Sequence, residues 1–140
     1  MVDEQEISYV ELTEDLADIP DETTKPDGEY QVQLVTFELA TSKNDPNRQM
    51  FHLQLEVVGE PLVKTIGHWL LIPNDSDDEK SVLRRKRAQR SFFEAFGIPT
   101  SGRIEFEEHI GKTGWAILTE EENKEYGKQN RVRRFVKSSK

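Results

Sequence analysis

The 140-residue sequence predicts a mainly β fold in which one helix interrupts a series of five short strands. Two observations predict this class. Apolar and polar residues alternate with period two in several segments bounded by Gly, Pro, Asn and Asp, which is typical of half-buried strands joined by turns. One other segment carries its apolar residues at helical spacing and ends at a glycine that a proline soon follows.

The first three strands are predicted within residues 28–73, as an antiparallel meander. Tyr30, Val32 and Leu34 alternate with polar residues in the first of them. The polar turn 42–47 and the Gly-Glu-Pro break at 59–61 separate the strands, because Gly, Pro, Asn and Asp favour turn conformations. The predicted strands are residues 28–34, 51–57 and 63–72.

The helix is predicted to begin at Ser76, which has capping-box spacing to Glu79. It should end at Phe96, because Gly97 favours a helix C-cap and Pro99 prevents continuation. The residues expected to share its apolar face are Val82, Ala88, Phe92, Phe93 and Phe96.

Two further strands are predicted after the helix, at 112–119 and 130–137. Three strands, a helix and two strands form the element order of an OB-fold, a five-stranded Greek-key barrel with a helix between strands 3 and 4. The phenylalanine face of the helix would then plug the barrel. We predict this OB-fold domain over residues 28–137.

The formal net charge of −8 is unevenly distributed. Residues 1–29 hold eleven acids and one base, whereas residues 30–140 hold sixteen acids and eighteen bases. We therefore predict an acidic, partly disordered arm over residues 1–27, in which residues 7–12 could add an edge strand or the arm could form a short helix. Such an arm contacts partners or competes for the basic surface of its own domain.

The sequence argues against an enzyme. It has no cysteine, and its three histidines lie far apart without the short spacings of a metal site. It also has no glycine-rich phosphate loop and no nucleophile elbow. We expect no catalysis and no cofactor.

The absence of a long apolar run predicts no membrane contact and a cytoplasmic protein.

Binding of single-stranded nucleic acid needs exposed aromatic rings for base stacking and Lys or Arg side chains along the phosphates. Trp69 is predicted to lie on the side of the third strand away from the core, either as a stacking platform or packed under a loop or the arm. Trp115 is assigned to the core. Arg131 and Arg133 are expected to point the same way from the last strand, with Arg134 pointing the opposite way.

The first hairpin turn is bracketed by Lys43 and Arg48, and in OB-folds this loop usually helps to clasp the bound strand. A second basic cluster lies at residues 84–90. Three roles are open for it: a solvated helix face, a binding site for the acidic arm, or an extension of the DNA-binding surface. The predicted nucleic-acid-binding residues are Lys43, Arg48, Lys64, Trp69, Tyr126, Lys128, Arg131 and Arg133.

An ordered series of short segments resembles a known family across residues 28–136. The segments are Gly28-Glu29-Tyr30, Thr41-Ser42-Lys43-Asn44, residues 50–58, Ile72-Pro73-Asn74, Phe96-Gly97-Ile98, His109-Ile110-Gly111-Lys112, Asn130-Arg131-Val132 and Phe135. The series is similar to a bacteriophage family catalogued as domain of unknown function 669, whose members are associated with OB-fold single-stranded DNA-binding proteins. The resemblance implies non-catalytic binding of single-stranded DNA during phage replication or recombination, in the infected host cell. From this resemblance, Lys43 of the turn motif is expected to contact the DNA.

Two alternatives stay open. One is a replisome or recombination adaptor that acts through its acidic arm, and the other is an RNA-binding OB module that uses the same surfaces. The better-known bacterial proteins of this function end in an acidic tail, whereas this chain ends in basic residues. We expect the arm at residues 1–27 to replace that tail and to recruit phage or host replication and recombination proteins.

Overall fold

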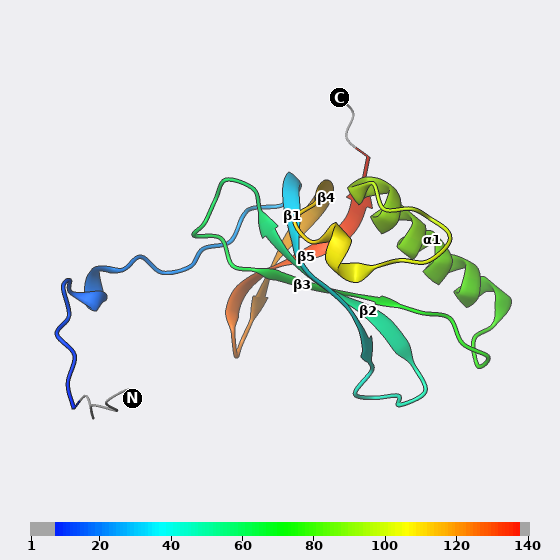
Figure 1. The fold of residues 1–140 in the computed structure, drawn as a ribbon, viewed down its shortest axis with the longest axis horizontal. Helices are drawn as coiled ribbons and strands as arrows, with labels where there is room; N and C mark the ends of the chain where they lie inside the picture. The colour runs from blue at the N-terminus through cyan, green and yellow to red at the C-terminus, as the bar shows by residue number, and fades with distance from the viewer. Residues whose placement is uncertain (1–7, 138–140) are drawn as a thin grey trace, which may run out of the picture.

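The computed structural model describes residues 8–137 and shows a mainly β chain with one long helix (Figure 1). The predicted order of three strands, a helix and two strands is confirmed. No helix within the described residues is long and apolar enough to cross a membrane. The elements are η1 Leu16–Asp18, β1 Gly28–Thr41, β2 Gln49–Val57, β3 Ile66–Leu71, α1 Glu79–Phe96, η2 Phe106–His109, β4 Thr113–Asn123 and β5 Gly127–Val136.

The strands form one antiparallel sheet in the order β3-β2-β1-β4-β5. The long β1 pairs with both neighbours, so Leu34 lies opposite Leu55 of β2 and Tyr30 lies opposite Ala116 of β4. No hydrogen-bonded ladder joins the edge strands β3 and β5 within residues 8–137. The structure therefore shows an open five-stranded sheet, and the closed barrel stays a prediction.

A β-bulge in β5 changes which arginines reach solvent. Val132 lies opposite Leu118 and Arg134 lies opposite Ile117, so Arg133 is an extra residue between two paired ones. The bulge shifts the period-two alternation by one position. Arg133 and Arg134 are both exposed as a result. The prediction that Arg134 points the opposite way from Arg131 and Arg133 is wrong for this reason.

The helix packs on the sheet through its C-terminal half. Phe92, Phe93 and Phe96 are buried, whereas Ala88 is exposed, so the predicted apolar face is only partly confirmed. The ring of Phe92 lies 5.3 Å from the ring of Phe135 of β5, between centroids. The N-terminal half of α1 makes little contact with the core, and its outer face carries most of the basic cluster 84–90.

The C-terminal end of α1 was predicted correctly, and its N-cap was not. Asp78, not Ser76, is the N-cap, because its carboxylate accepts a hydrogen bond from the Ser81 amide at 2.7 Å. Ser76 instead donates its amide to the Asn74 side chain at 3.0 Å. The helix ends before Gly97, as predicted, and that glycine has a left-handed φ of 69°.

The core side of β4 consists of Gly114, Ala116 and Leu118, all buried. The helix approaches so closely that a Cβ on Gly114 would lie 2.8 Å from the carbonyl oxygen of Ala95. Trp115 therefore lies on the opposite side of the strand and is half-buried. Its predicted place in the core is wrong, because the side of β4 that contacts the helix has no room for a large side chain.

The N-terminal arm extends away from the sheet over residues 8–22, all of which are exposed (Figure 1). The structure shows no edge strand at residues 8–12, and Ile7, also part of that prediction, lies outside the described residues together with the rest of 1–7. The next five residues, 23–27, contact the sheet. Thr23 forms a β-bridge with Val63, and the Asn130 side chain donates to the Lys25 carbonyl at 2.8 Å.

Candidate nucleic-acid interface

The edge strands β3 and β5 approach each other along a line that we call the β3–β5 seam, residues 64–71 and 126–135. Lys64 Nζ donates to the backbone carbonyls of Lys128 at 2.9 Å and Tyr126 at 3.3 Å. The ring of His68 contacts the ring of Phe135, with centroids 5.4 Å apart. Because side chains join these edges in place of a backbone ladder, the seam contains two hollows.

The first hollow, the seam pocket, has a volume of about 220 Å³ and lies between the start of β3 and the first half of β5. Its lining contains two basic side chains and one indole, and none of its lining residues is a carboxylate. The pocket is lined by Lys64, Thr65, Gly67, Trp69, Gln129, Asn130 and Arg131.

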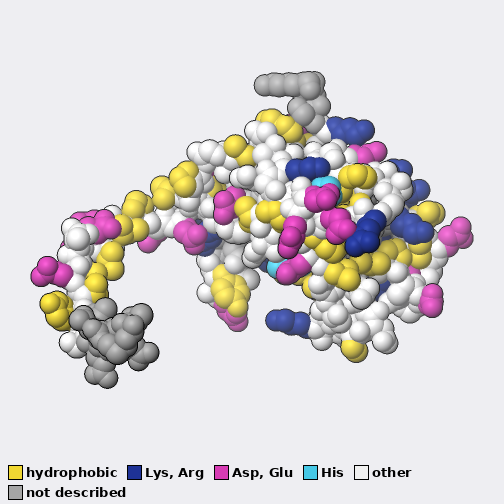
Figure 2. Space-filling view, viewed as in Figure 1, with side chains coloured by type: hydrophobic (Ala, Val, Ile, Leu, Met, Phe, Trp, Pro, Cys, Tyr) yellow, Lys and Arg dark blue, Asp and Glu magenta, His cyan; other side chains and the backbone are white. Residues whose placement is uncertain are grey.

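The second hollow, the helix groove, has a volume of about 390 Å³ and lies between α1, β3 and β5. Four arginines from two elements surround it, and again no lining residue is a carboxylate. Lys and Arg side chains gather over α1 in Figure 2, whereas Asp and Glu side chains lie along the extended arm and in a group on the body of the molecule. The groove is lined by His68, Trp69, Leu70, Leu71, Arg84, Arg85, Ala88, Ser91, Arg133, Arg134 and Phe135.

Trp69 lines both hollows and faces away from the core, as predicted from the alternation in β3. Its side chain is 46% exposed. The indole stacks on the imidazole of His52 with centroids 5.1 Å apart and an interplanar angle of 22°. His52 Nδ1 in turn lies 2.8 Å from the Glu38 carboxylate. An aromatic ring that is held in place yet partly exposed can stack a base.

His52 and Glu38 were missed as supports of Trp69. The feature that identifies these two residues is the register of the strands. His52 lies directly opposite Trp69, and Glu38 lies directly opposite His52. Cross-strand neighbours of this kind interact on one face of a sheet. A prediction of the register of β1, β2 and β3 would have identified both residues.

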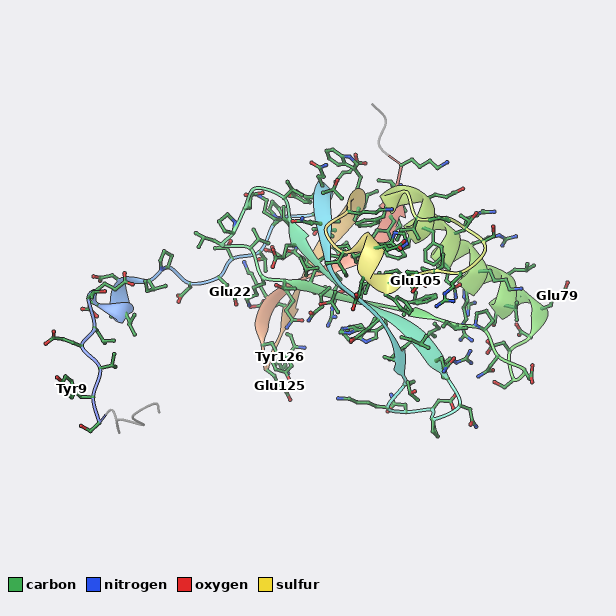
Figure 3. The ribbon with its side chains drawn as sticks, viewed as in Figure 1. Tyr9, Glu22, Glu79, Glu105, Glu125 and Tyr126 are labelled. Atoms are coloured by element: carbon green, nitrogen blue, oxygen red, sulfur yellow. The ribbon has the colours of Figure 1, made fainter. Side chains whose placement is uncertain are left out.

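Most of the predicted basic residues of β5 lie along the seam. Lys128 is exposed, and Arg131 lies 3.4 Å from Glu121, a partly exposed pair that compensates some of its charge. Arg133 lines the helix groove. Tyr126 is 64% exposed at the tip of the β4–β5 hairpin, beside Glu125 (Figure 3).

The two predicted residues of the β1–β2 connection differ. Lys43 is exposed, and this connection projects to the same side of the molecule as the β4–β5 hairpin (Figure 1). Arg48 is only 8% exposed and makes two hydrogen bonds to Asp77, at 2.6 and 2.7 Å, and one to the Ile72 carbonyl. The expected role of Arg48 in phosphate binding is not supported, because its guanidinium joins two loops.

Two ionisable groups near the seam have shifted pKa values. The guanidinium groups of Arg48 and Arg85 hold the pKa of Asp77 well below its usual range. Burial lowers the pKa of His68 to about 4, so this imidazole is neutral at pH 7. The positive charge of the helix groove therefore comes from its arginines. Within residues 8–137, no group of three or more His, Asp or Glu is arranged to hold a metal ion.

The fold and this interface define a small β domain with one antiparallel sheet, one helix and a basic, indole-bearing seam. The chain belongs to the family described as "Protein of unknown function (DUF669)", whose profile matches residues 12–138. The expected membership of the family of unknown function 669 is thereby confirmed, and the match begins earlier, within the acidic arm. A search of curated proteins found no match.

Proposed function

We propose that the protein binds single-stranded DNA with little sequence preference, in phage DNA replication or recombination. The observation that carries this proposal is the position of Trp69, half-exposed between two hollows that contain Lys and Arg but no carboxylate. A base stacks on an aromatic ring whatever its sequence, and basic side chains neutralise the phosphates on either side.

The strand order supports an OB-type arrangement. In an OB-fold the strand 2–3 face and the loops between strands 1 and 2 and between strands 4 and 5 bind oligonucleotides. Here Trp69 and His52 lie on β3 and β2, Lys43 lies in the β1–β2 connection, and Tyr126 lies in the β4–β5 connection. OB barrels are partly open, so an open β3–β5 edge is compatible with the proposal.

The charge pattern predicts strong salt dependence. In this proposal five basic residues contact phosphates, although the Lys64 ammonium also donates to two backbone carbonyls and Arg131 lies 3.4 Å from Glu121. Each phosphate neutralised on a single strand contributes about −0.7 to the slope of log K against log salt, so five contacts predict about −3.5. The five residues are Lys43, Lys64, Lys128, Arg131 and Arg133.

The test is fluorescence anisotropy of a labelled oligothymidine against matched duplex DNA and RNA. The proposal predicts tight binding to single-stranded DNA, weaker binding to duplex, and a steep fall in affinity with salt. Lys128→Glu should weaken binding, whereas Arg103→Glu, an exposed charge reversal away from the seam, should not. Equal or tighter binding of RNA would change the ligand to RNA. Absence of binding to all three would refute the proposal.

A second candidate function is a replisome or recombination adaptor that acts through the arm. The observation that favours it is the exposure of apolar side chains, among them Tyr9 and Leu12, on an acidic segment that projects from the body (Figure 3). An adaptor of this kind would leave the anisotropy of oligothymidine unchanged, and it would bind a partner protein only when residues 8–22 are present.

A further inference from the structure

The described part of the arm has the composition of an amphipathic helix. Residues 8–22 contain six acids and no base. Four apolar residues are spaced by three, four and three positions, which places them on one face of a helix that Pro20 would end. All four are more than half exposed in the structure. They are Tyr9, Leu12, Leu16 and Ile19.

A helical turn is already present in this segment. Residues Leu16–Asp18 form a 3₁₀ turn, and the Asp15 carboxylate accepts a hydrogen bond from the Ala17 amide at 2.9 Å. If the helix extended over residues 9–19, Glu11, Asp15 and Asp18 would flank the apolar face along one ridge. The segment would then present apolar side chains and carboxylates together.

The helix groove has the complementary composition. Its floor includes Leu70 and Phe135, and its rim carries four arginines. Arg85 pairs with Asp77 at 2.5 Å, whereas the other three arginines form no ion pair within residues 8–137. Uncompensated guanidinium groups around an apolar floor fit a ligand that combines carboxylates with apolar side chains.

We propose that the helix groove of one copy binds residues 9–19 of a second copy, folded as a helix. The arm leaves its own body at the end of the sheet opposite α1 and extends away from that helix (Figure 1), which favours the groove of a neighbour. Arm and groove are different surfaces, so the contact is heterologous and adds copies in a row. It needs no DNA, so its test is independent of the proposed function.

The test is sedimentation equilibrium of the full chain without DNA, at low salt. The wild type should associate reversibly, and added salt should weaken the association. Two double variants should each be monomeric: Leu12→Ser with Leu16→Ser in the arm, and Arg133→Glu with Arg134→Glu in the groove. A mixture of the two should form a 1:1 complex that grows no further, because only one arm and one groove remain intact.

Arg87→Glu with Arg90→Glu is the matched control, since it makes the same charge change on the exposed side of α1 outside the groove. This control should associate like the wild type. Circular dichroism of each variant checks that it is folded. A wild type that is monomeric at all concentrations would overturn the proposal. So would a groove variant whose self-association is unchanged, whether or not it loses the affinity for oligothymidine that Arg133 is proposed to contribute.

Discussion

His68 makes the stability of the fold depend on pH in a window that few other groups affect. Its ring lines the helix groove beside the ring of Phe135, and burial lowers its pKa to about 4 from the usual 6.5. A base with a depressed folded pKa takes up its proton more readily in the unfolded state. Stability should therefore be complete above pH 6.5 and fall as the pH drops toward 4.

The size of the effect follows from the two pKa values. Each unit of difference is worth about 1.4 kcal/mol once the pH lies between them, so the loss should reach about 2 kcal/mol at pH 5 and about 3 kcal/mol at pH 4. Urea unfolding at pH 7, 6 and 5 measures it, since carboxylates contribute little above pH 5.

The matched variants isolate this imidazole. His68→Gln should flatten the dependence between pH 7 and 5, because it removes the titrating group. His52→Gln, on the adjacent strand beside Trp69, should leave the dependence in place. If His68→Gln retains the wild-type slope, the depressed pKa of His68 does not contribute and the reasoning is refuted.

Two further predictions concern the packing that positions the seam. Arg48→Met should lower the free energy of unfolding by about 3 kcal/mol, because it removes one partner of a buried ion pair, although Arg85 still contacts Asp77. A loss below about 1 kcal/mol in urea unfolding would contradict the buried pair. Gly114→Ala should cost about 1–3 kcal/mol through overpacking against the helix. Gly28→Ala, where a Cβ would meet no atom closer than 3.4 Å and the backbone has no positive φ, should cost much less, and equal losses would contradict the close approach at Gly114.

Features that depend on short-range patterns could be predicted from the sequence. Strand alternation gave the order of the elements and the exposed side of Trp69, because side-chain direction in a strand follows directly from a period of two. The C-terminal end of α1 could also be predicted from the sequence, because a glycine at 97 followed by a proline at 99 rarely allows a helix to continue. These local rules act over a few residues and need no knowledge of partners.

Features that depend on long-range partners could not be predicted. The bulge at Arg133 depends on the register of β4 against β5, and it brought Arg134 into the helix groove. Arg48 was predicted as a surface cation because its partner Asp77 lies 29 residues away in the sequence. Trp115 was assigned to the core, although the helix contact at Gly114 leaves no room on that side of β4.

The most direct test of the central claim uses the two tryptophans of the chain. In a Trp115→Phe variant, Trp69 is the only indole, and its fluorescence reports directly on the seam. Titration with oligothymidine at about 50 mM and 200 mM salt should give saturable quenching at low salt and much weaker quenching at high salt. In the wild-type background, Trp69→Ala should then cost about 1–3 kcal/mol of binding free energy. Fluorescence that does not change on addition of oligothymidine at low salt would contradict the proposal that single-stranded DNA binds at Trp69.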